Sequence, residues 1–119
     1  MASAEIIIVT PDVAFGHSII FVLESGGFRV LSYGSLDMAF TWAQARDVGC
    51  AVVDEEAILD RHHAQKLFRS FARPVILLVD HFRESPGVPL VRCLTKPFLG
   101  EPLLEAVQDA IAGNSAPDT

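Results

Sequence analysis

Five short apolar runs, separated by stretches with helical periodicity, constrain the fold of this chain more than any other feature of its sequence. The first, third and fourth runs are almost continuous Val, Ile, Leu or Ala. Such composition is typical of strands that are covered on both faces in a parallel sheet. We therefore predict five β-strands. They occupy residues 6–9, 29–33, 50–54, 75–79 and 91–94.

Four stretches between and after these runs carry apolar side chains at the three- and four-residue spacing of a helix. The predicted helices are residues 13–25, 36–45, 56–71 and 101–112. Gly26 ends the first helix, Ser35 is the expected N-cap of the second, Pro74 follows the third and Gly113 ends the last. Strands that alternate with helices predict an open, doubly wound α/β fold.

The segment between the last two strands, residues 80–90, departs from this alternation. It contains Pro86, Gly87 and Pro89, which leave little room for an ordinary helix. A parallel crossover usually needs a dozen or more residues. We predict a loop or one short turn where a fourth helix is expected. Its apolar side chains either cover the sheet or form a surface for a partner or a second copy of the chain.

Length and composition limit the classes of protein that remain. The 119 residues suit one domain, which we expect over residues 1–113, with a flexible tail at 114–119. A formal net charge of −6 argues against non-specific binding to DNA or to anionic membranes. No apolar run approaches the roughly 20 residues of a membrane helix, and we expect no signal peptide before the first strand. We expect a cytoplasmic protein that does not bind membrane or nucleic acid directly.

The remaining motifs do not indicate a catalytic or metal site. Cys50 and Cys93 lie in separate apolar runs, outside any CxxC or Cys/His cluster, and are expected to be reduced, buried thiols. His62 and His63 are adjacent, so they lack the spacing of a metal pair on a helix. No phosphate-binding glycine motif or hydrolase elbow occurs. We interpret the basic group along the third predicted helix as a solvated face: Arg61, Lys66, Arg69 and Arg73.

In a doubly wound sheet, ligands bind beyond the carboxyl ends of the strands, and two charged residues lie there. Asp54 ends a buried strand, where an acid either reaches a ligand or caps the following helix. Lys96 ends the fifth run, where it either reaches a carboxylate across the sheet edge or is an exposed lysine. Position alone leaves both alternatives open for each residue.

Taken together, these pieces resemble the receiver domain of response regulators over residues 6–112. The matching pieces are an apolar first strand followed by an acid, a helix that ends in Glu-Ser-Gly-Gly-Phe, a third strand that ends in Asp54, Pro74 before the fourth strand, and Leu-Thr-Lys-Pro-Phe around Lys96. The last piece is the most specific. Residues 28–40 also resemble receivers that precede LuxR-type DNA-binding domains. The resemblance implies a flavodoxin-like five-stranded parallel sheet of order 2-1-3-4-5, here with the fourth helix shortened or missing.

The resemblance also implies a chemistry for the two charged residues. In receivers, an aspartate accepts a phosphoryl group from a phosphohistidine of a kinase, and that position corresponds to Asp54. A Mg²⁺ neutralises charge during the transfer, and a lysine, here Lys96, contacts a phosphoryl oxygen.

The magnesium site of the family is altered in this sequence. Receivers carry a pair of acids after the first strand, and the matching residues here are Thr10 and Pro11. Mg²⁺ requires oxygen ligands in near-octahedral geometry, usually including one or two carboxylates. Asp12 follows one position later. Asp12 and Asp54 are therefore weak candidates for holding Mg²⁺, and Asp12 is read first as the N-cap of the first helix.

Two further positions of the pocket also differ from the family. The Ser or Thr that bonds the phosphoryl group in receivers corresponds to Val79, which has no hydroxyl. The Tyr or Phe that moves on activation corresponds to Cys93. Asp80 is expected to be an outward-facing loop residue. The sequence therefore resembles an atypical receiver, or pseudo-receiver.

Three functions follow from this interpretation. The first is a non-enzymatic two-component signalling module that acts through contacts with a histidine kinase, another signalling protein or a second copy of itself, with Mg²⁺-dependent phosphorylation of Asp54 impaired or absent. The second is a receiver phosphorylated on Asp54 by a histidine kinase. The third is the regulatory fragment of a LuxR-type DNA-binding regulator.

Overall fold

The computed structural model describes residues 5–44, 48–80, 90–96 and 100–115 of the chain. A parallel sheet of five strands forms its centre, in the order β2-β1-β3-β4-β5. This is the predicted order. The strands are β1 (Glu5–Val9), β2 (Arg29–Tyr33), β3 (Val48–Asp54), β4 (Val75–Val79) and β5 (Val91–Thr95).

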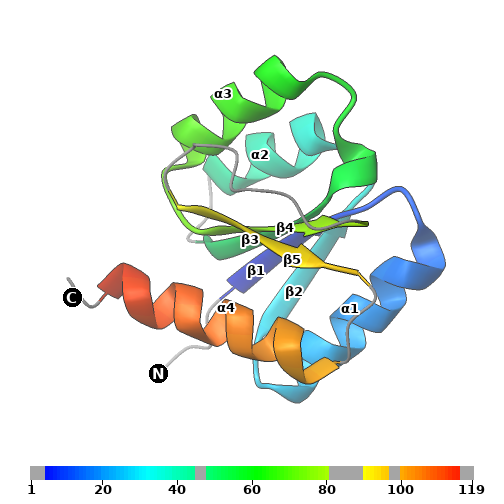
Figure 1. Ribbon diagram of the computed structural model, residues 1–119, viewed down its shortest axis with the longest axis vertical. Helices are drawn as coiled ribbons and strands as arrows, with labels where there is room; N and C mark the ends of the chain where they lie inside the picture. Colours follow the sequence, from blue (N-terminus) through cyan, green and yellow to red (C-terminus); the bar gives the residue numbers. More distant parts are fainter. Residues whose placement is uncertain (1–4, 45–47, 81–89, 97–99, 116–119) are drawn as a thin grey trace.

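Helices cover both faces of the sheet, as a parallel sheet requires. They are α1 (Val13–Ser25), α2 (Leu36–Gln44), α3 (Arg61–Phe71) and α4 (Gly100–Ser115), with a 3-10 turn η1 (Glu55–Ala57) after β3. Helices α2 and α3 lie on one face, and α1 and α4 lie on the other (Figure 1). The predicted loss of a helix between β4 and β5 concerns residues 81–89, which lie outside the described residues.

The alternation of side chains along the strands divides the core into two layers. Ile7 and Val9 of β1 belong to a cluster with α2 and α3, whereas Ile6 and Ile8 belong to a cluster with α1 and α4. All four side chains are buried. Because neighbouring residues of a strand point to opposite faces, a strand that is apolar at every position is stable only between two helical layers.

Polar side chains determine where the helices begin. Asp12 accepts a hydrogen bond from a backbone N–H of the first turn of α1, and Ser35 does the same at α2. These two N-caps are as predicted. Asp60 accepts from the N–H groups of His62 and His63, and α3 therefore begins at Arg61.

The start of the third helix differs from the prediction, which placed it at residue 56. The Asp54 carboxylate caps η1, Ile58 is extended, and Asp60 then caps α3 as a separate element. The apolar spacing of residues 56–60 does not distinguish one continuous helix from two elements with separate caps. The last helix also passes Gly113, the predicted end, and finishes at Ser115.

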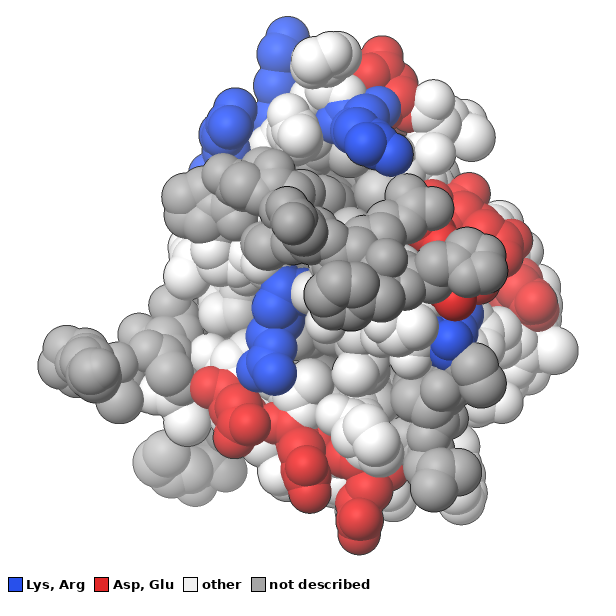
Figure 2. All heavy atoms as spheres, in the orientation of Figure 1, with Lys and Arg blue, Asp and Glu red and all other residues white. Residues whose placement is uncertain are grey.

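The face seen in Figure 2 carries basic groups over α3 and a row of acidic groups along α4, with further charges of both signs between and beside them. The basic side chains Arg61, Lys66 and Arg69 of α3 are exposed, as predicted. Arg73, which was predicted to share this solvated face, is instead partly buried and donates a hydrogen bond to the Val48 carbonyl at 2.7 Å. The acidic side chains of α4 recur every four residues: Glu101, Glu105 and Asp109. None of the described helices is long and apolar enough to cross a membrane.

We predict that truncating a central core side chain destabilises the fold far more than the same change at the surface. Leu78 of β4 is completely buried, so Leu78→Ala should lower the free energy of unfolding by about 2–5 kcal/mol. Leu59 is 97% exposed, so Leu59→Ala is the matched control and should leave stability nearly unchanged. Urea unfolding measures both, and equal losses would contradict the described core.

Candidate functional site

The register of the sheet gathers the candidate residues at its carboxyl edge. Val9 pairs with Val53, Asp54 pairs with Leu78, and Val79 pairs with Thr95. The residues that follow these pairs therefore emerge side by side, although they are far apart in sequence. They are Thr10 after β1, Asp80 after β4 and Lys96 after β5, beside Asp54 at the end of β3.

The carboxylate of Asp54 is buried and engaged on both oxygens. Its Oδ2 accepts a hydrogen bond from the Thr10 hydroxyl at 2.9 Å. Its Oδ1 accepts from Lys96 Nζ at 2.9 Å and from the Glu56 backbone N–H at 3.1 Å. Asp54 is only 1% exposed, so these three donors replace the water that a carboxylate otherwise requires. Asp54 therefore caps the next turn, which is one of its two predicted alternatives, and it also meets the lysine.

Three carboxylates from different parts of the edge lie near the Lys96 ammonium. Nζ is 2.9 Å from Asp54 Oδ1, 3.4 Å from Asp80 Oδ1 and 3.8 Å from Glu56 Oε2. The same nitrogen lies 5.0 Å from the centre of the Phe15 ring of α1, in the range of a cation–π contact. Only 15% of the Lys96 side chain is exposed. The alternative of a freely exposed lysine is therefore wrong.

This environment favours the charged form of the lysine. Burial alone lowers the pKa of Lys96, but its hydrogen bond to Asp54 and the charges of Asp54 and Asp80 outweigh burial. The pKa of Lys96 therefore lies above its ordinary value of 10.5. The lysine is a fixed positive charge at neutral pH.

Asp80 faces the pocket, contrary to the expectation of an outward-facing loop residue. Its side chain is 52% exposed, yet Oδ1 approaches Lys96 as described above. Its backbone N–H also donates a hydrogen bond to Glu55 Oε2 at 2.7 Å, and the Lys96 N–H donates to the Val79 carbonyl at 2.7 Å. The ends of β3, β4 and β5 are therefore joined by both side-chain and backbone bonds.

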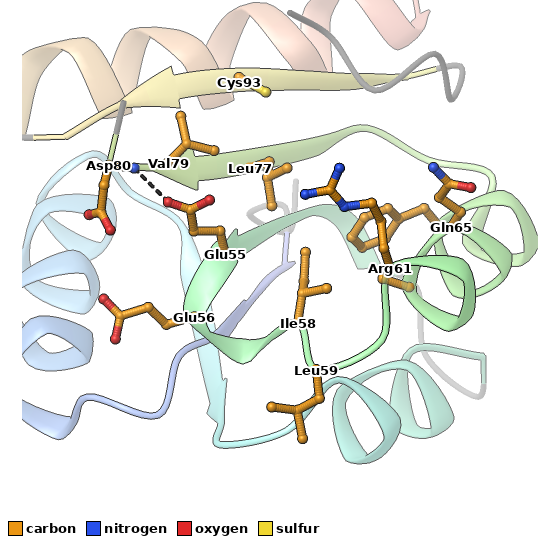
Figure 3. A pocket seen from close by; sticks show the side chains of 12 residues that line it. Glu55, Glu56, Ile58, Leu59, Arg61, Gln65, Leu77, Val79, Asp80 and Cys93 are labelled. Atoms are coloured by element: carbon orange, nitrogen blue, oxygen red, sulfur yellow. Dashed lines mark hydrogen bonds between the residues drawn. The ribbon is translucent and has the colours of Figure 1, made fainter. Parts of the chain in front are cut away.

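A cavity of about 700 Å³ adjoins this pocket, between η1, α3, β4 and β5. Leu77, Val79 and Cys93 reach it from the strands, and Glu55 and Asp80, joined by the hydrogen bond just described, lie at one end (Figure 3). Neither Asp54 nor Lys96 lines it. The cavity is therefore a neighbour of the charged pocket, with Glu56 and Asp80 belonging to both.

The positions at which the sequence differs from receivers lie around the carboxyl edge of the sheet. Asp12 uses Oδ1 at the N-terminus of α1, where it accepts from the Phe15 N–H at 3.0 Å. Its own N–H donates to the Thr10 hydroxyl oxygen at 3.2 Å. Val79 is buried with no hydroxyl to offer, and Cys93 is half buried. Pro97, which follows Lys96 in the Leu-Thr-Lys-Pro-Phe motif, lies outside the described residues.

Cys50 is a buried thiol as predicted, whereas Cys93, also predicted to be buried, is only half buried. Neither Cys50 nor Cys93 forms a disulfide. Burial raises the pKa of Cys50 to about 12, so this thiol stays protonated at neutral pH. His63 Nε2 lies 2.6 Å from Asp37 Oδ1, which links the exposed surfaces of α3 and α2. His17 is exposed on α1, and His81 lies outside the described residues.

Sequence reasoning missed three participants in the pocket. The Thr10 hydroxyl, dismissed as a metal ligand, is a hydrogen-bond donor to Asp54. Glu56 adds both a backbone donor and a carboxylate, and the Phe15 ring lies beside Lys96. Glu56 follows Asp54 by two residues, the spacing of a capped turn, and this spacing is the only signal that could have indicated it.

Comparison with solved structures identifies the fold as that of response-regulator receivers, the CheY-like fold. The receiver domain of a sensor histidine kinase from Pseudomonas aeruginosa, solved with magnesium in its active-site cleft, is 24% identical, with a TM-score of 0.80 over 93% of this chain and 99% of the other. The chemotaxis regulator CheY4 of Vibrio cholerae is 18% identical, with a TM-score of 0.77 over 91% and 98%. The sequence itself matches no family model and no curated protein.

A third similar structure places the same fold within a longer chain. Full-length FixJ from B. japonicum is 23% identical, with a TM-score of 0.77, and the match covers 95% of this chain but 60% of that one. At these identities the likeness establishes the fold alone.

The residues present do not fit the magnesium ion that the fold implies. Thr10 and Asp12, the oxygen-bearing side chains after β1, are engaged with Asp54 and with the N-terminus of α1, and Pro11 has no side-chain oxygen. Among the residues that the structure describes, no group of three His, Cys, Asp or Glu side chains is arranged to hold a metal ion. The charge beside Asp54 that the structure supplies is the Lys96 ammonium.

We predict that Lys96→Met lowers the free energy of unfolding by about 3 kcal/mol, because it leaves the buried Asp54 carboxylate without its counter-ion. Adding Asp54→Asn should restore much of this loss, since the neutral amide needs no partner charge. Urea unfolding of the wild type, both single variants and the double variant measures the coupling. Additive losses would contradict the described ion pair.

We also predict a specific pH dependence. Since the folded-state pKa of Lys96 is above its ordinary value of 10.5, its contribution to stability is complete below that pH. It is lost as pH rises through the folded-state pKa. The stability difference between wild type and Lys96→Met should therefore shrink only as pH rises above 10.5. A difference that is constant across this range would show that the lysine charge is not involved.

Proposed function

We propose that this chain is a receiver-type module of two-component signalling that works through protein contacts, with Mg²⁺-dependent phosphorylation of Asp54 impaired or absent. It belongs in the cytoplasm, where its partners are a histidine kinase or another signalling protein. It has no catalytic turnover of its own. The fold supports the assignment to receiver-type modules. The burial and hydrogen bonding of Asp54 support impaired or absent phosphorylation.

This proposal rests on a single observation: the Asp54 carboxylate is buried and both of its oxygens accept hydrogen bonds. A carboxylate that attacks phosphorus must present an oxygen lone pair to an incoming donor. Asp54 is 1% exposed, and both of its oxygens accept hydrogen bonds from Thr10, Lys96 or Glu56. An approaching phosphoryl donor would have to displace these partners before attack.

The charge of the pocket also disfavours a phosphoryl group on Asp54. A phosphoryl group on Asp54 would bring further negative charge to an edge where Glu56 and Asp80 already lie near one lysine and Glu55 accepts from the Asp80 N–H. Phosphoryl transfer normally depends on cations that neutralise this charge. In the described pocket, Val79 also offers no hydroxyl to bond the new oxygens.

The second candidate is a phosphorylated receiver that uses Asp54 despite these changes. One observation favours it: the Lys96 ammonium lies 2.9 Å from Asp54 Oδ1, where it would also meet a phosphoryl oxygen. The third candidate, a regulatory fragment of a LuxR-type regulator, draws on the match to part of full-length FixJ. A homodimer is a further alternative, which light scattering at several concentrations would decide.

We predict that the wild-type protein, incubated with acetyl phosphate and Mg²⁺, gains little or no phosphoryl group. Intact mass spectrometry measures the gain directly, with Asp54→Asn as the negative control. Rapid Mg²⁺-dependent gain of one phosphoryl group, lost in Asp54→Asn, would overturn the proposal and favour the second candidate.

A matched variant tests whether the altered positions are the cause. Thr10→Asp, Pro11→Asp and Val79→Thr together restore the acids and the hydroxyl that receivers carry at these positions. We expect this triple variant to be phosphorylated faster than the wild type under the same conditions. If the folded triple variant stays unmodified, the cause lies elsewhere in the pocket.

A further inference from the structure

The edge of the sheet that β5 forms lies between two rows of opposite charge. β5 is the last strand in the order of the sheet, and α3 and α4 flank it on opposite faces (Figure 1). The exposed basic side chains of α3 form the basic row: Arg61, Lys66 and Arg69. The exposed acidic side chains of α4 form the acidic row: Glu101, Glu105 and Asp109. Charges of opposite sign therefore stand on the two sides of β5.

Both rows lie on the same face of the molecule, which Figure 2 shows. On α3, His63 contacts Asp37 of α2, whereas Arg61 lines the cavity between α3, β4 and β5. The basic row therefore begins on the side of α3 that is turned away from α2. On α4, Leu104 lies over Gly26 at the end of α1, and the acidic row lies outside this contact.

The two rows match in direction and in length. α3 and α4 both begin at the carboxyl edge of the sheet, α3 after β3 and η1 and α4 after β5, and both run back along the parallel strands. The two helices therefore run in the same direction. Arg61 and Arg69 are eight positions apart, as are Glu101 and Asp109. At 1.5 Å of rise per residue, each row is about 12 Å long.

We propose that this face binds a second copy of the same chain, with the basic row of each copy against the acidic row of the other. The two copies are related by a two-fold axis parallel to α3 and α4. Rotation about such an axis preserves the direction of each helix, so Arg61 comes opposite Glu101 of the second copy. Because the surface is self-complementary, the contact between rows forms twice. A two-fold axis in this face at right angles to the helices would instead place like charges together.

The charge of the whole chain limits the strength of this contact. Two copies with a formal net charge of −6 each repel one another at long range. Arg92 of β5 points to the α4 face, because its sheet partner Ile76 packs with α1 and α4. It offsets part of the acidic row, which stays negative. We therefore expect a weak dimer at about 0.1 M salt, where a Debye length of about 10 Å screens the overall repulsion more than the close contacts between rows.

Sedimentation equilibrium of the wild-type protein tests for this dimer, at about 10 µM to about 1 mM protein and in about 0.1 M or about 1 M salt. At the lower salt, the mass should rise with concentration from that of a monomer towards that of a dimer. At about 1 M salt the Debye length falls to about 3 Å, so the Kd for dimerisation should increase at least about tenfold. A monomer at every concentration, or a dimer that salt does not weaken, would overturn the inference.

Charge reversal tests which surfaces meet. One variant reverses part of the basic row, Lys66→Glu with Arg69→Glu, and the other reverses part of the acidic row, Glu105→Lys with Asp109→Lys. Each variant alone faces like charges in its second copy, so its Kd should increase at least about tenfold. An equimolar mixture of the two should dimerise again, because the reversed rows are complementary to each other. Folded variants that do not dimerise when mixed would show that the proposed pairing is wrong.

Arg29→Glu is the matched control for the single variant Arg69→Glu. It reverses one exposed charge on β2, at the opposite edge of the sheet, and should leave the Kd unchanged. If Arg29→Glu weakens the dimer as much as Arg69→Glu does, the contact does not belong to this face and the inference is wrong. Circular dichroism establishes that each variant is folded. If the reversed variants do not fold, the salt dependence of the wild type decides.

A second copy of the chain is one of the contact partners that the proposed function allows, so the dimer rests on that proposal and deepens it. The two nevertheless fail separately. Wild-type protein that gains a phosphoryl group on Asp54 and also dimerises through the two rows would defeat only the proposed function. Wild-type protein that is neither phosphorylated nor dimeric would defeat only the inference.

Discussion

The buried ion pair between Asp54 and Lys96 is the interaction on which the carboxyl edge of this sheet depends. The two residues are 42 positions apart, yet their side chains meet at 2.9 Å because β3, β4 and β5 lie side by side in parallel. A nearly inaccessible carboxylate must be paired or hydrogen-bonded to remain charged. Asp54 has both, since the Thr10 hydroxyl donates to Oδ2 and the Glu56 N–H donates to Oδ1, the oxygen that also meets the lysine.

The same pair connects the fold to its proposed function. A receiver that exchanges phosphoryl groups needs an accessible carboxylate and a removable metal ion beside it. Here the cation is the ammonium of Lys96, which is part of the chain, and hydrogen bonds occupy both oxygens of the Asp54 carboxylate. These features suit a module that keeps the receiver shape for protein contacts while its pocket serves as internal structure. The adjoining cavity shares Glu56 and Asp80 with this pocket.

Much of the fold could be predicted from the sequence because the apolar pattern and the backbone geometry favour the same arrangement of strands and helices. Continuous Val, Ile and Leu runs such as 75–79 exclude an exposed face, and right-handed crossovers then leave few strand orders. The caps at Asp12 and Ser35 could be predicted because they depend only on local backbone donors. The predicted start of α3 was wrong because Asp54 and Asp60 cap two separate elements, η1 and α3. The apolar spacing of this stretch resembles that of one continuous helix.

By itself, the sequence determined the α/β alternation, the five strands, and the presence of an acid and a lysine at strand ends. Only the tertiary structure decided what surrounds these two charges. It turned Asp80 toward the lysine, brought the Phe15 ring beside it, and gave the Thr10 hydroxyl to Asp54. The physical reason is that side-chain periodicity reports which face of an element is buried, whereas electrostatic partners at a sheet edge depend on register between strands far apart in the chain.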